Sequence, residues 1–447
     1  MAAPDLPARP GASGFPASRR SVLKGFASTL GAAALPGILA ACGDSGGSDK
    51  GSSGGNSVTF GSNYSDPAPK QAFAALTQAA TTSAGVNIKV NTTDHNTFQN
   101  NINSYLQGTP DDLFTWFAGY RMQFFAQQGL IANIDDVWDK IGSNFNAASQ
   151  GLSKGLDGHY YFVPIYNYPW VVFYNKSTFT EKGYTIPKTW DDFMALVKKM
   201  KTDGLIPMAY ADKDGWPALG TFDIINLRVN GYDYHINLMK HKVPWTDSKV
   251  TDVFNQWAEL LPYCQTGSTG RIWQDAAKTL ENKQAGMMFQ GTNQVAAQYV
   301  TDGKDLSDLD FFPFPEINPT YGQDYMDAPT DGFCISKNAK NAAAAKKVLE
   351  YIGTAPAEAT YLKTDQWDVA LANNASVPTY NAIQQKSVQA IAACKSVSQF
   401  MDRDTDPGFA DNVMIPAIQK FITNPSAGNI KTLQGQIEAQ AKTIFTS

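Results

Sequence analysis

Aromatic rings and polar side chains follow directly after predicted strands in this sequence. Asn63, Tyr64 and Asp66 come just after the first apolar run of the body, and Trp116 lies at the end of a later one. In an α/β sheet, ligands bind beyond the carboxyl ends of the strands. Sugars present apolar C–H faces and hydroxyl edges, so a sugar site needs flat rings beside planar polar groups. With 12% aromatic and only 17% charged residues, the composition favours such a site.

No motif for metal, nucleotide or covalent chemistry occurs in the sequence context that such chemistry requires. The run Asp402-Arg403-Asp404-Thr405-Asp406 superficially matches a calcium loop, but Pro407 and Val413 stand where that loop requires glycine and glutamate. The four histidines lack zinc-site spacing, no phosphate-loop or GxGxxG pattern occurs, and the GxSxG matches at 43–47, 51–55 and 151–155 do not follow predicted strands, as a nucleophile elbow requires. We therefore expect no metal, no cofactor and no catalysis. A sugar cleft with two carboxylates, for example Asp66 and Asp331, could still serve a glycoside hydrolase, and a glycan-holding adhesin is a third alternative.

The N-terminal 57 residues combine export and anchoring signals. Ser18-Arg19-Arg20-Ser21-Val22-Leu23-Lys24 has the twin-arginine pattern, and the apolar stretch 25–41 is short for a membrane-spanning helix. Leu39-Ala40-Ala41-Cys42 has the form of a bacterial lipobox, in which the cysteine is lipidated and becomes the mature N-terminus. Residues rich in Gly and Ser follow. We expect a signal peptide over 1–41, a flexible tether over 42–57 and an extracytoplasmic protein, lipid-anchored to the cell membrane, rather than a short membrane anchor.

Charge and length limit the partners and the architecture. Removing the signal peptide takes away four basic residues and one acidic residue, so the net charge of −5 becomes about −8. An acidic body argues against nucleic acid or anionic lipid as a partner. The body of about 390 residues exceeds the size at which one core keeps growing, so two lobes are expected. Cys264, Cys334 and Cys394 lack CxxC spacing, and we expect buried thiols with at most one disulfide.

The body alternates predicted strands and helices. The strands are expected at 58–64, 86–90, 111–117, 161–164 and 171–174, and the helices at 69–80, 97–106, 190–201, 341–351, 384–393, 413–423 and 430–445. Phe98, Ile102, Tyr105 and Leu106 show the helical spacing on which such assignments rest. This alternation predicts an α/β fold with parallel sheets covered by helices.

Five sequence blocks carry a resemblance to a known family. They are Gly108–Trp116, Val163–Lys176 followed by Pro187–Phe193, Asp214–Ala218, Lys283–Met288 and Ala328–Phe333. In order and spacing they resemble the carbohydrate-binding solute-binding proteins of ABC importers, a class related to the maltose-binding protein. The resemblance covers nearly the whole mature chain. It implies a non-enzymatic, monomeric receptor without a cofactor that closes on a soluble mono- or oligosaccharide and delivers it to permease subunits in the membrane.

The resemblance also implies the architecture. Such proteins have a periplasmic-binding-protein-like fold, in which two α/β lobes are joined by hinge crossings and the ligand lies in the cleft between them. By analogy, the N-terminal lobe comprises residues 58–168 plus 330–370, and the C-terminal lobe comprises 169–329 plus 371–447. The crossings are expected near 166–171, 327–333 and 365–378.

The resemblance places these residues at the cleft as ligand-binding candidates: Asn63, Tyr64, Asp66, Trp116, Phe117, Tyr120, Arg121, Asn167, Tyr168, Trp170, Trp216, Asp223, Gly291, Thr292, Asn293, Asp331, Asp402 and Arg403. Among them, Trp116, Trp216 and Asp331 are the main candidates for ligand contact, because aromatic and acidic residues in loops at such places are often functional.

Several aromatic and charged residues have a second interpretation. Arg121 can equally be an ion-pair partner within one lobe, Trp190 is expected in the core, and Trp273 fits either place. Relatives with maltose as ligand have tryptophan where Asn293 stands and an acidic residue where Tyr168 stands. Both differences argue against a maltose-type ligand.

Overall fold

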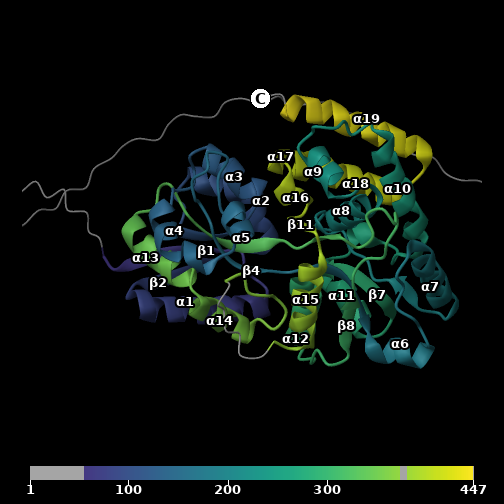
Figure 1. The fold of residues 1–447 in the computed structure, drawn as a ribbon, viewed down its shortest axis with the longest axis horizontal. Helices are drawn as coiled ribbons and strands as arrows, with labels where there is room; N and C mark the ends of the chain where they lie inside the picture. The colour runs from purple at the N-terminus through teal and green to yellow at the C-terminus, as the bar shows by residue number, and fades with distance from the viewer. Residues whose placement is uncertain (1–54, 373–379, 446–447) are drawn as a thin grey trace, which may run out of the picture. The chain divides into compact units, whose positions relative to one another are not determined.

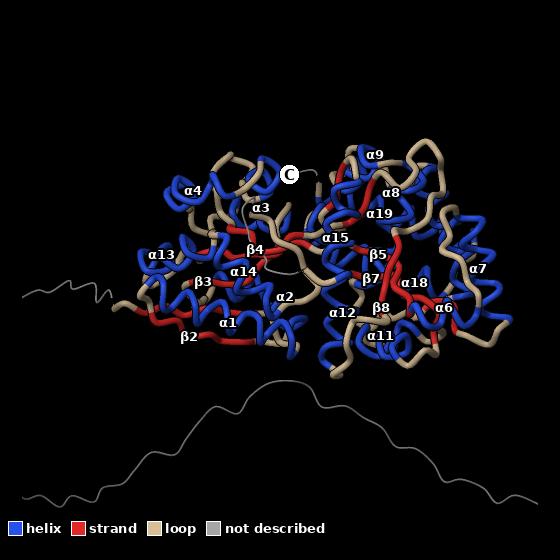
Figure 2. Tube along the Cα trace, turned by 60° about the horizontal axis from the view of Figure 1, so that its bottom comes forward, coloured by secondary structure: helices blue, strands red, loops and turns tan. Residues whose placement is uncertain are grey.

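Two sheets organise the computed structural model, which describes residues 55–372 and 380–445 (Figures 1 and 2). The first has the order β2-β1-β3-β10-β4, and the second β6-β7-β5-β8. The strands of the first sheet are β1 (Ser57–Ser62), β2 (Asn87–Thr92), β3 (Leu113–Phe117), β4 (Val163–Asn167) and β10 (Thr330–Ile335). Those of the second are β5 (Trp170–Asn175), β6 (Ile206–Met208), β7 (Ala285–Gly291) and β8 (Leu309–Phe312). The predicted α/β class is confirmed.

The first sheet and its helices form the N-terminal lobe, on the left in Figures 1 and 2. These helices are α1 (Pro67–Ala84), α2 (His95–Gln107), α3 (Tyr120–Gln127), α4 (Asp135–Ile141), α5 (Ala147–Leu152), α13 (Ala342–Ile352) and α14 (Ala355–Thr364). In α1, Pro67 suits the first turn and Gly85 ends the helix in the left-handed region with φ 63°. Its buried stripe, which includes Phe73 and Leu76, packs against α13 and α14.

The second sheet and the remaining helices form the C-terminal lobe. The helices are α6 (Lys176–Lys182), α7 (Trp190–Thr202), α8 (Pro217–Asn230), α9 (Tyr232–Met239), α10 (Ser248–Leu260), α11 (Trp273–Glu281), α12 (Thr292–Thr301), α15 (Ala382–Ala393), α16 (Met401–Asp404), α17 (Pro407–Phe409), α18 (Ile415–Thr423) and α19 (Ala427–Ile444). Strands β9 (Tyr325–Asp327) and β11 (Ser396–Ser398) pair with each other. Trp190 lies in the core, where it packs against Phe193 and Phe314.

The expectation of parallel sheets holds only in part. Strands β1, β2 and β3 are parallel, but β10 runs antiparallel to both of its neighbours, and so does β5 in the second sheet. Parallel neighbours need a crossover connection within one lobe. Strand β10 does not follow such a crossover. It enters the first sheet directly after β9 and can therefore run antiparallel to its neighbours. In the C-terminal helices, residues 410–414 form a π-helical turn before α18.

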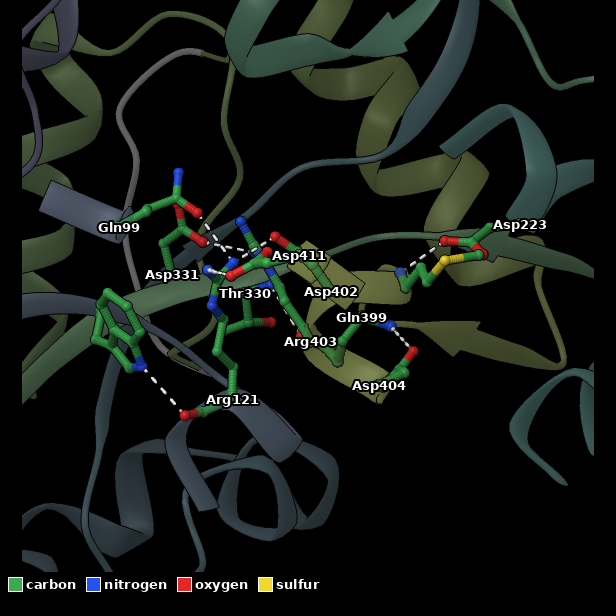
Figure 3. Close-up of polar contacts among 12 residues, drawn as sticks. Gln99, Arg121, Asp223, Thr330, Asp331, Gln399, Asp402, Arg403, Asp404 and Asp411 are labelled. Atoms are coloured by element: carbon green, nitrogen blue, oxygen red, sulfur yellow. Dashed lines mark hydrogen bonds and ion pairs between the residues drawn. The ribbon is translucent and has the colours of Figure 1, made fainter. Parts of the chain in front are cut away.

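Helix α16 connects the two lobes. It packs against α8 and α9 of the C-terminal lobe and also against α3 of the N-terminal lobe. Residues Asp402 and Arg403 of this short helix therefore reach across to the other lobe (Figure 3).

Other predictions concern the cysteines and the N-terminal segment. Cys264, Cys334 and Cys394 are unpaired thiols; Cys334 is fully buried and the other two partly buried. Cys42, the signal peptide and most of the tether lie outside the described residues. Among the helices of the described part, none is both long and apolar enough to cross a membrane.

Candidate functional site

A polar pocket lies between the lobes. The N-terminal side contributes Asn63, Tyr64, Ser65, Asp66, Pro69, Asp94, His95, Asn96, Tyr166, Asp331 and Tyr361, followed by Asp365, Trp367 and Asp368 from the segment after α14. The C-terminal side contributes Trp216, Trp273, Gln274, Asn293 and Gln294. The pocket has ≈ 680 Å³ of empty space, its open mouth included.

A smaller hollow continues the pocket toward α16. It shares His95, Trp216, Asn293, Gln294 and Asp331 with the main pocket, and adds Gln99, Tyr168, Trp170, Phe400, Asp402 and Arg403. Because the two spaces share walls from both lobes, we treat them as one cleft.

The amide of Asn63 shows how the fold aims a side chain into this cleft. The residue follows β1, and its backbone N–H donates to Thr115 Oγ1 of the neighbouring strand β3 at 2.9 Å. The same hydroxyl donates to Asn63 Oδ1 at 2.8 Å. With its oxygen occupied, Asn63 points Nδ2 at the pocket, where that buried atom has no partner within the described protein.

Further buried polar atoms of the lining also lack a protein partner within residues 55–372 and 380–445. The donors, beside Asn63 Nδ2, are Trp216 Nε1 and Trp367 Nε1, and the acceptors are Gln274 Oε1, Asn293 Oδ1, Gln294 Oε1, Asp365 Oδ2 and Asp368 Oδ1. A buried polar group without a hydrogen bond costs about 1–3 kcal/mol. A ligand that both donates and accepts would satisfy this mixture, and hydroxyl groups do both.

Aromatic hydroxyls connect the lining to its carboxylate. Tyr166 OH donates to Asp331 Oδ2 at 3.1 Å and lies 3.2 Å from Tyr64 OH. The Tyr166 ring stacks on Tyr361 with centroids 5.2 Å apart. Burial and the nearby charge of Asp331 raise the pKa of Tyr64 and Tyr166 well above the ordinary tyrosine value. These phenols therefore remain neutral hydrogen-bonding groups.

Arg403 is the cation of the cleft. Its Nη1 donates to Asp331 Oδ1 at 2.7 Å (Figure 3), and its Nη2 donates to Tyr168 OH at 2.8 Å. The guanidinium lies 4.1 Å from the centroid of the Phe117 ring, within cation–π range. Burial opposes the charge, but Asp331 and Tyr168 outweigh it, so the pKa of Arg403 is raised. The C-terminal lobe thus neutralises a carboxylate of the N-terminal lobe.

Arg121 makes a second ion pair across the lobes. Its Nη1 contacts Asp402 Oδ2 at 2.5 Å and donates to Gln99 Oε1 at 2.9 Å (Figure 3). Its Nη2 lies 3.5 Å from Asp411 Oδ2. Trp116 Nε1 donates to the Arg121 carbonyl at 3.3 Å. Arg121 lies behind the cleft and does not line it.

His95 contributes an uncharged imidazole to the cleft wall. Burial, followed by the positive charges of Arg403 and Arg121, lowers its pKa to about 4. Its ring lies between Phe117 and Trp216, with centroids 6.2 and 6.4 Å away. At neutral pH the imidazole therefore adds no charge to the pocket.

The candidates predicted from the sequence fall into two groups. Those that line the cleft are Asn63, Tyr64, Asp66, Tyr168, Trp170, Trp216, Asn293, Asp331, Asp402 and Arg403. Those that do not are Trp116, Phe117, Tyr120, Arg121, Asn167, Asp223, Gly291 and Thr292. For both groups, contact with the ligand remains a prediction. The structure places several residues of the second group in other positions.

The residues outside the lining support it from behind. Trp116 is 1% exposed in an aromatic cluster with Phe114 and Phe125, and Phe117 stacks under Arg403. Asp223 accepts from the backbone N–H of Met401 at 2.6 Å inside the C-terminal lobe.

Gly291, Thr292 and Asn167 lie at the connections between the lobes. A Cβ at Gly291 would come within 2.8 Å of Asn293 Oδ1, so this glycine leaves room for that side chain. Thr292 N–H donates to Pro169 O at 3.2 Å, and Asn167 pairs with Val369. Tyr120, the remaining candidate, begins α3 and is partly buried.

Sequence reasoning missed several lining residues. They are Ser65, Pro69, Asp94, His95, Asn96, Gln99, Tyr166, Gln274, Gln294, Tyr361, Asp365, Trp367, Asp368 and Phe400. The run Asp365-Gln366-Trp367-Asp368 repeats the mixture of ring and carboxylate on which the other candidates rested, and that signal could have found it. Trp273, which fitted either place, is 8% exposed and lines the pocket.

Comparison with protein families gives one match, to bacterial extracellular solute-binding proteins, over residues 64–359. An uncharacterized ABC transporter extracellular-binding protein of Pyrococcus horikoshii is 26% identical over 65% of this chain and 65% of its own length. The multiple sugar-binding protein of Streptococcus mutans is 26% identical over 52% of this chain and 59% of its own. The chain thus matches less than two thirds of the length of these curated relatives.

Solved structures are similar over more of the chain. The bacterial solute receptor AcbH, described as having an exclusive substrate preference for β-D-galactopyranose, is 70% identical, with a TM-score of 0.86 over 88% of this chain and 100% of its own. A chitin oligosaccharide binding protein has a TM-score of 0.76 at 19% identity, over 87% of this chain and 99% of its own. The second likeness concerns the fold alone.

Proposed function

We propose that this chain, which belongs to the family of bacterial extracellular solute-binding proteins, captures a carbohydrate in the cleft between its lobes and delivers it to an ABC importer. The observation that carries the proposal is the set of buried, unpartnered donors and acceptors set among tryptophan and tyrosine rings in one pocket. Hydroxyls satisfy the polar atoms, and the rings cover the C–H faces. Closure of the lobes would bury the sugar.

The ligand we propose is a monosaccharide of the galactopyranose type. The 70% identical receptor with that preference supports it. So does the small size of the hollow toward α16, whose walls include the side chains of Arg403, Tyr168 and Trp170. The sequence departures at Asn293 and Tyr168 argue in the same direction, away from a maltose-type ligand.

Delivery and anchoring complete the proposal. We expect export through the twin-arginine signal, lipidation of Cys42 and a flexible tether that keeps a monomeric receptor near the permease subunits. We also propose the lobe boundaries 58–168 plus 330–370 and 169–329 plus 371–447. Sheet membership supports them, because β4 and β10 belong to the first sheet whereas β5 and β8 belong to the second.

A receptor fits the carboxyl groups better than a glycosidase does. Glycosidases hold two carboxyls roughly 5–9.5 Å apart on either side of the scissile bond. Asp365 Oδ1 instead accepts from the backbone N–H of Asp368 at 3.0 Å, so these two residues of the lining lie on the same side of the cleft, and Asp331 is engaged by Arg403. We therefore propose that the cleft binds sugar without cleaving it.

Isothermal titration calorimetry with galactose, glucose, maltose and raffinose tests the proposal. Galactose should bind with a dissociation constant in the micromolar range or below, and the other sugars should bind at least about tenfold more weakly, since each lost hydrogen bond to a buried partner costs 1 kcal/mol or more. A flat response to every sugar would contradict the proposal. Release of reducing ends from an oligosaccharide would favour the hydrolase instead.

A further inference from the structure

The main pocket has more acidic groups than basic groups that could neutralise them. Five carboxyl groups line it, those of Asp66, Asp94, Asp331, Asp365 and Asp368, and the lining contains no lysine or arginine among the described residues. Arg403, in the adjoining hollow, is already bound to Asp331. A ligand entering the pocket therefore meets uncompensated negative charge.

Asp365 and Asp368 form a buried pair within this lining. They are 0% and 1% exposed. Asp365 Oδ1 accepts from the backbone N–H groups of Trp367 and Asp368 at 3.2 and 3.0 Å. Asp365 Oδ2 and Asp368 Oδ1 have no hydrogen-bond partner among the described groups. Burial and the neighbouring charge of Asp365 raise the pKa of Asp368 well above the ordinary value, so we take Asp368 as the protonated member of the pair and Asp365 as the charged one.

We propose that the Asp365–Asp368 pair makes the pocket selective for uncharged sugars: it binds hydroxyls of a neutral pyranose and excludes sugars that carry a carboxylate, such as uronic acids. The inference rests on the proposed function and specifies its substrate class. A half-protonated pair supplies a donor and an acceptor side by side, as neighbouring hydroxyls require.

Exclusion of anions follows from the same arrangement. Galacturonate keeps the pyranose ring of galactose but replaces the C6 alcohol with a carboxylate. Its charge would be buried beside Asp365 with no free cation to neutralise it. No described cluster of His, Cys, Asp or Glu could hold a metal ion that would bridge the two charges. Like charges placed together in a buried interface cost several kcal/mol, so we expect binding to weaken by about 100-fold or more.

Titration of the wild-type protein with galactose, galacturonate and galacturonamide tests the exclusion. The amide has the shape of the acid without its charge. We expect it to bind within about tenfold of galactose, because one changed hydrogen-bonding group costs about 1 kcal/mol, while galacturonate binds far more weakly. Equal binding of galactose and galacturonate would overturn the inference. So would equal weakness of acid and amide, because the exclusion would then be steric.

A second experiment uses Asp368→Asn and Asp368→Leu. Asparagine reproduces the protonated carboxyl, since its amide both donates and accepts, whereas leucine has a similar size and no polar atom. We expect the asparagine variant to bind galactose within about threefold of wild type and the leucine variant to lose about 100-fold, because it leaves Asp365 and the sugar hydroxyls unpaired. Thermal unfolding of each variant shows that it is folded. Equal weakness of two folded variants would overturn the role of the pair.

The pH dependence of galactose affinity adds a further test. It would be the same in wild type and variant if the pair had a purely structural role. Burial raises the pKa of Asp365 to about 6 and that of Asp368 further. The other titratable groups near the pair are Asp331, Tyr64, Tyr166, Tyr168, Tyr361 and Tyr380. Wild-type affinity should fall as the pH rises and Asp368 loses its proton, and Asp368→Asn should flatten this fall. A parallel fall in both proteins would contradict the inference.

The outcomes separate the inference from the proposed function. If wild type binds no neutral sugar, the proposed function fails. If it binds galactose and galacturonate alike, only the inference fails. The surface variant Asp136→Asn, which removes an exposed partner of Lys346, is a control that should leave both titrations unchanged.

Discussion

Two buried arginines cross between the lobes in opposite directions. Arg403 reaches from the C-terminal lobe to Asp331 of the N-terminal lobe, and Arg121 reaches from the N-terminal lobe to Asp402. The acceptor of one pair is the sequence neighbour of the donor of the other, and both pairs lie together in Figure 3. Each guanidinium also lies over the ring of Phe117.

Their surroundings differ in one respect. Arg403 lines the cleft and fixes a carboxylate of its wall, whereas Arg121 lies behind the cleft and touches only other protein groups. The difference shows that the same ion-pair chemistry can serve two tasks. We expect Arg403 to set the polarity of the sugar site and Arg121 to stabilise the closed arrangement of the lobes.

The variant Arg403→Met should have the largest effect. It leaves Asp331 buried without its cation, so we expect the free energy of unfolding to fall by about 3–5 kcal/mol. Galactose affinity should fall by about 100-fold or more, because that loss of charge balance lies within the site. Denaturant unfolding and calorimetry measure both.

The exposed pair of Lys395 and Asp324 provides a matched control for that variant. Lys395→Met removes a cation from a surface pair, which should cost at most about 1 kcal/mol and leave affinity unchanged. If Arg403→Met behaved like this control, the assignment of Arg403 to the site would be wrong.

Variants of the second pair should have a smaller effect on affinity. We expect Arg121→Gln and Asp402→Asn each to weaken galactose binding by about tenfold, because closure loses an interaction of about 1.4 kcal/mol that opening must break. The double variant should be no weaker than either single one, since groups in one ion pair are coupled. Additive losses would show that the two side chains act separately.

A variant that lacks one hydroxyl group tests a single contact of Arg403. Tyr168 OH accepts from Arg403 Nη2 at 2.8 Å, and Tyr168→Phe removes only this acceptor. A hydrogen bond to a charged group contributes about 1.5–3 kcal/mol, so we expect a stability loss near the lower figure and a several-fold loss of affinity. An unchanged dissociation constant would mean that Asp331 alone positions Arg403.

The fold could be predicted further than the site. Helices such as α7 and α13 follow from helical spacing and their N-caps, Thr189 and Asn341, which are local features of the sequence. The reversed direction of β10 could not be predicted, because it depends on a strand that enters from the other lobe. Strand ends located Asn63 and Tyr64, but position along a strand does not decide which ring faces the core. Trp116 and Trp216 illustrate the difference, since only Trp216 lines the cleft.

The long-range ion pairs lay beyond local reasoning. Arg121 and Asp402 are 281 residues apart in the chain, and no spacing rule connects positions so distant. The Asp365–Asp368 pair was missed for another reason. Its residues fall in the third expected crossing between the lobes, from which no candidate was taken, although the first two crossings supplied Asn167, Tyr168, Trp170 and Asp331.

The smallest effect should come from Trp116→Phe, which tests the boundary between core and cleft. The variant removes the hydrogen bond from the indole to the Arg121 carbonyl and part of a buried ring, so we expect a stability loss of about 1–2 kcal/mol. The aromatic cluster that contains Phe114 and Phe125 should otherwise remain. Galactose affinity should stay within about twofold, because the change reaches the cleft only through Arg121.

Comparison of the two readouts decides what Trp116 does. Denaturant unfolding reports its packing, and calorimetry reports any contact with the sugar. A large loss of affinity without a loss of stability would place this ring against the ligand, as its position at the end of β3 first predicted. A stability loss alone would make Trp116 a residue that supports Arg121, and through it the closed cleft, from inside the N-terminal lobe.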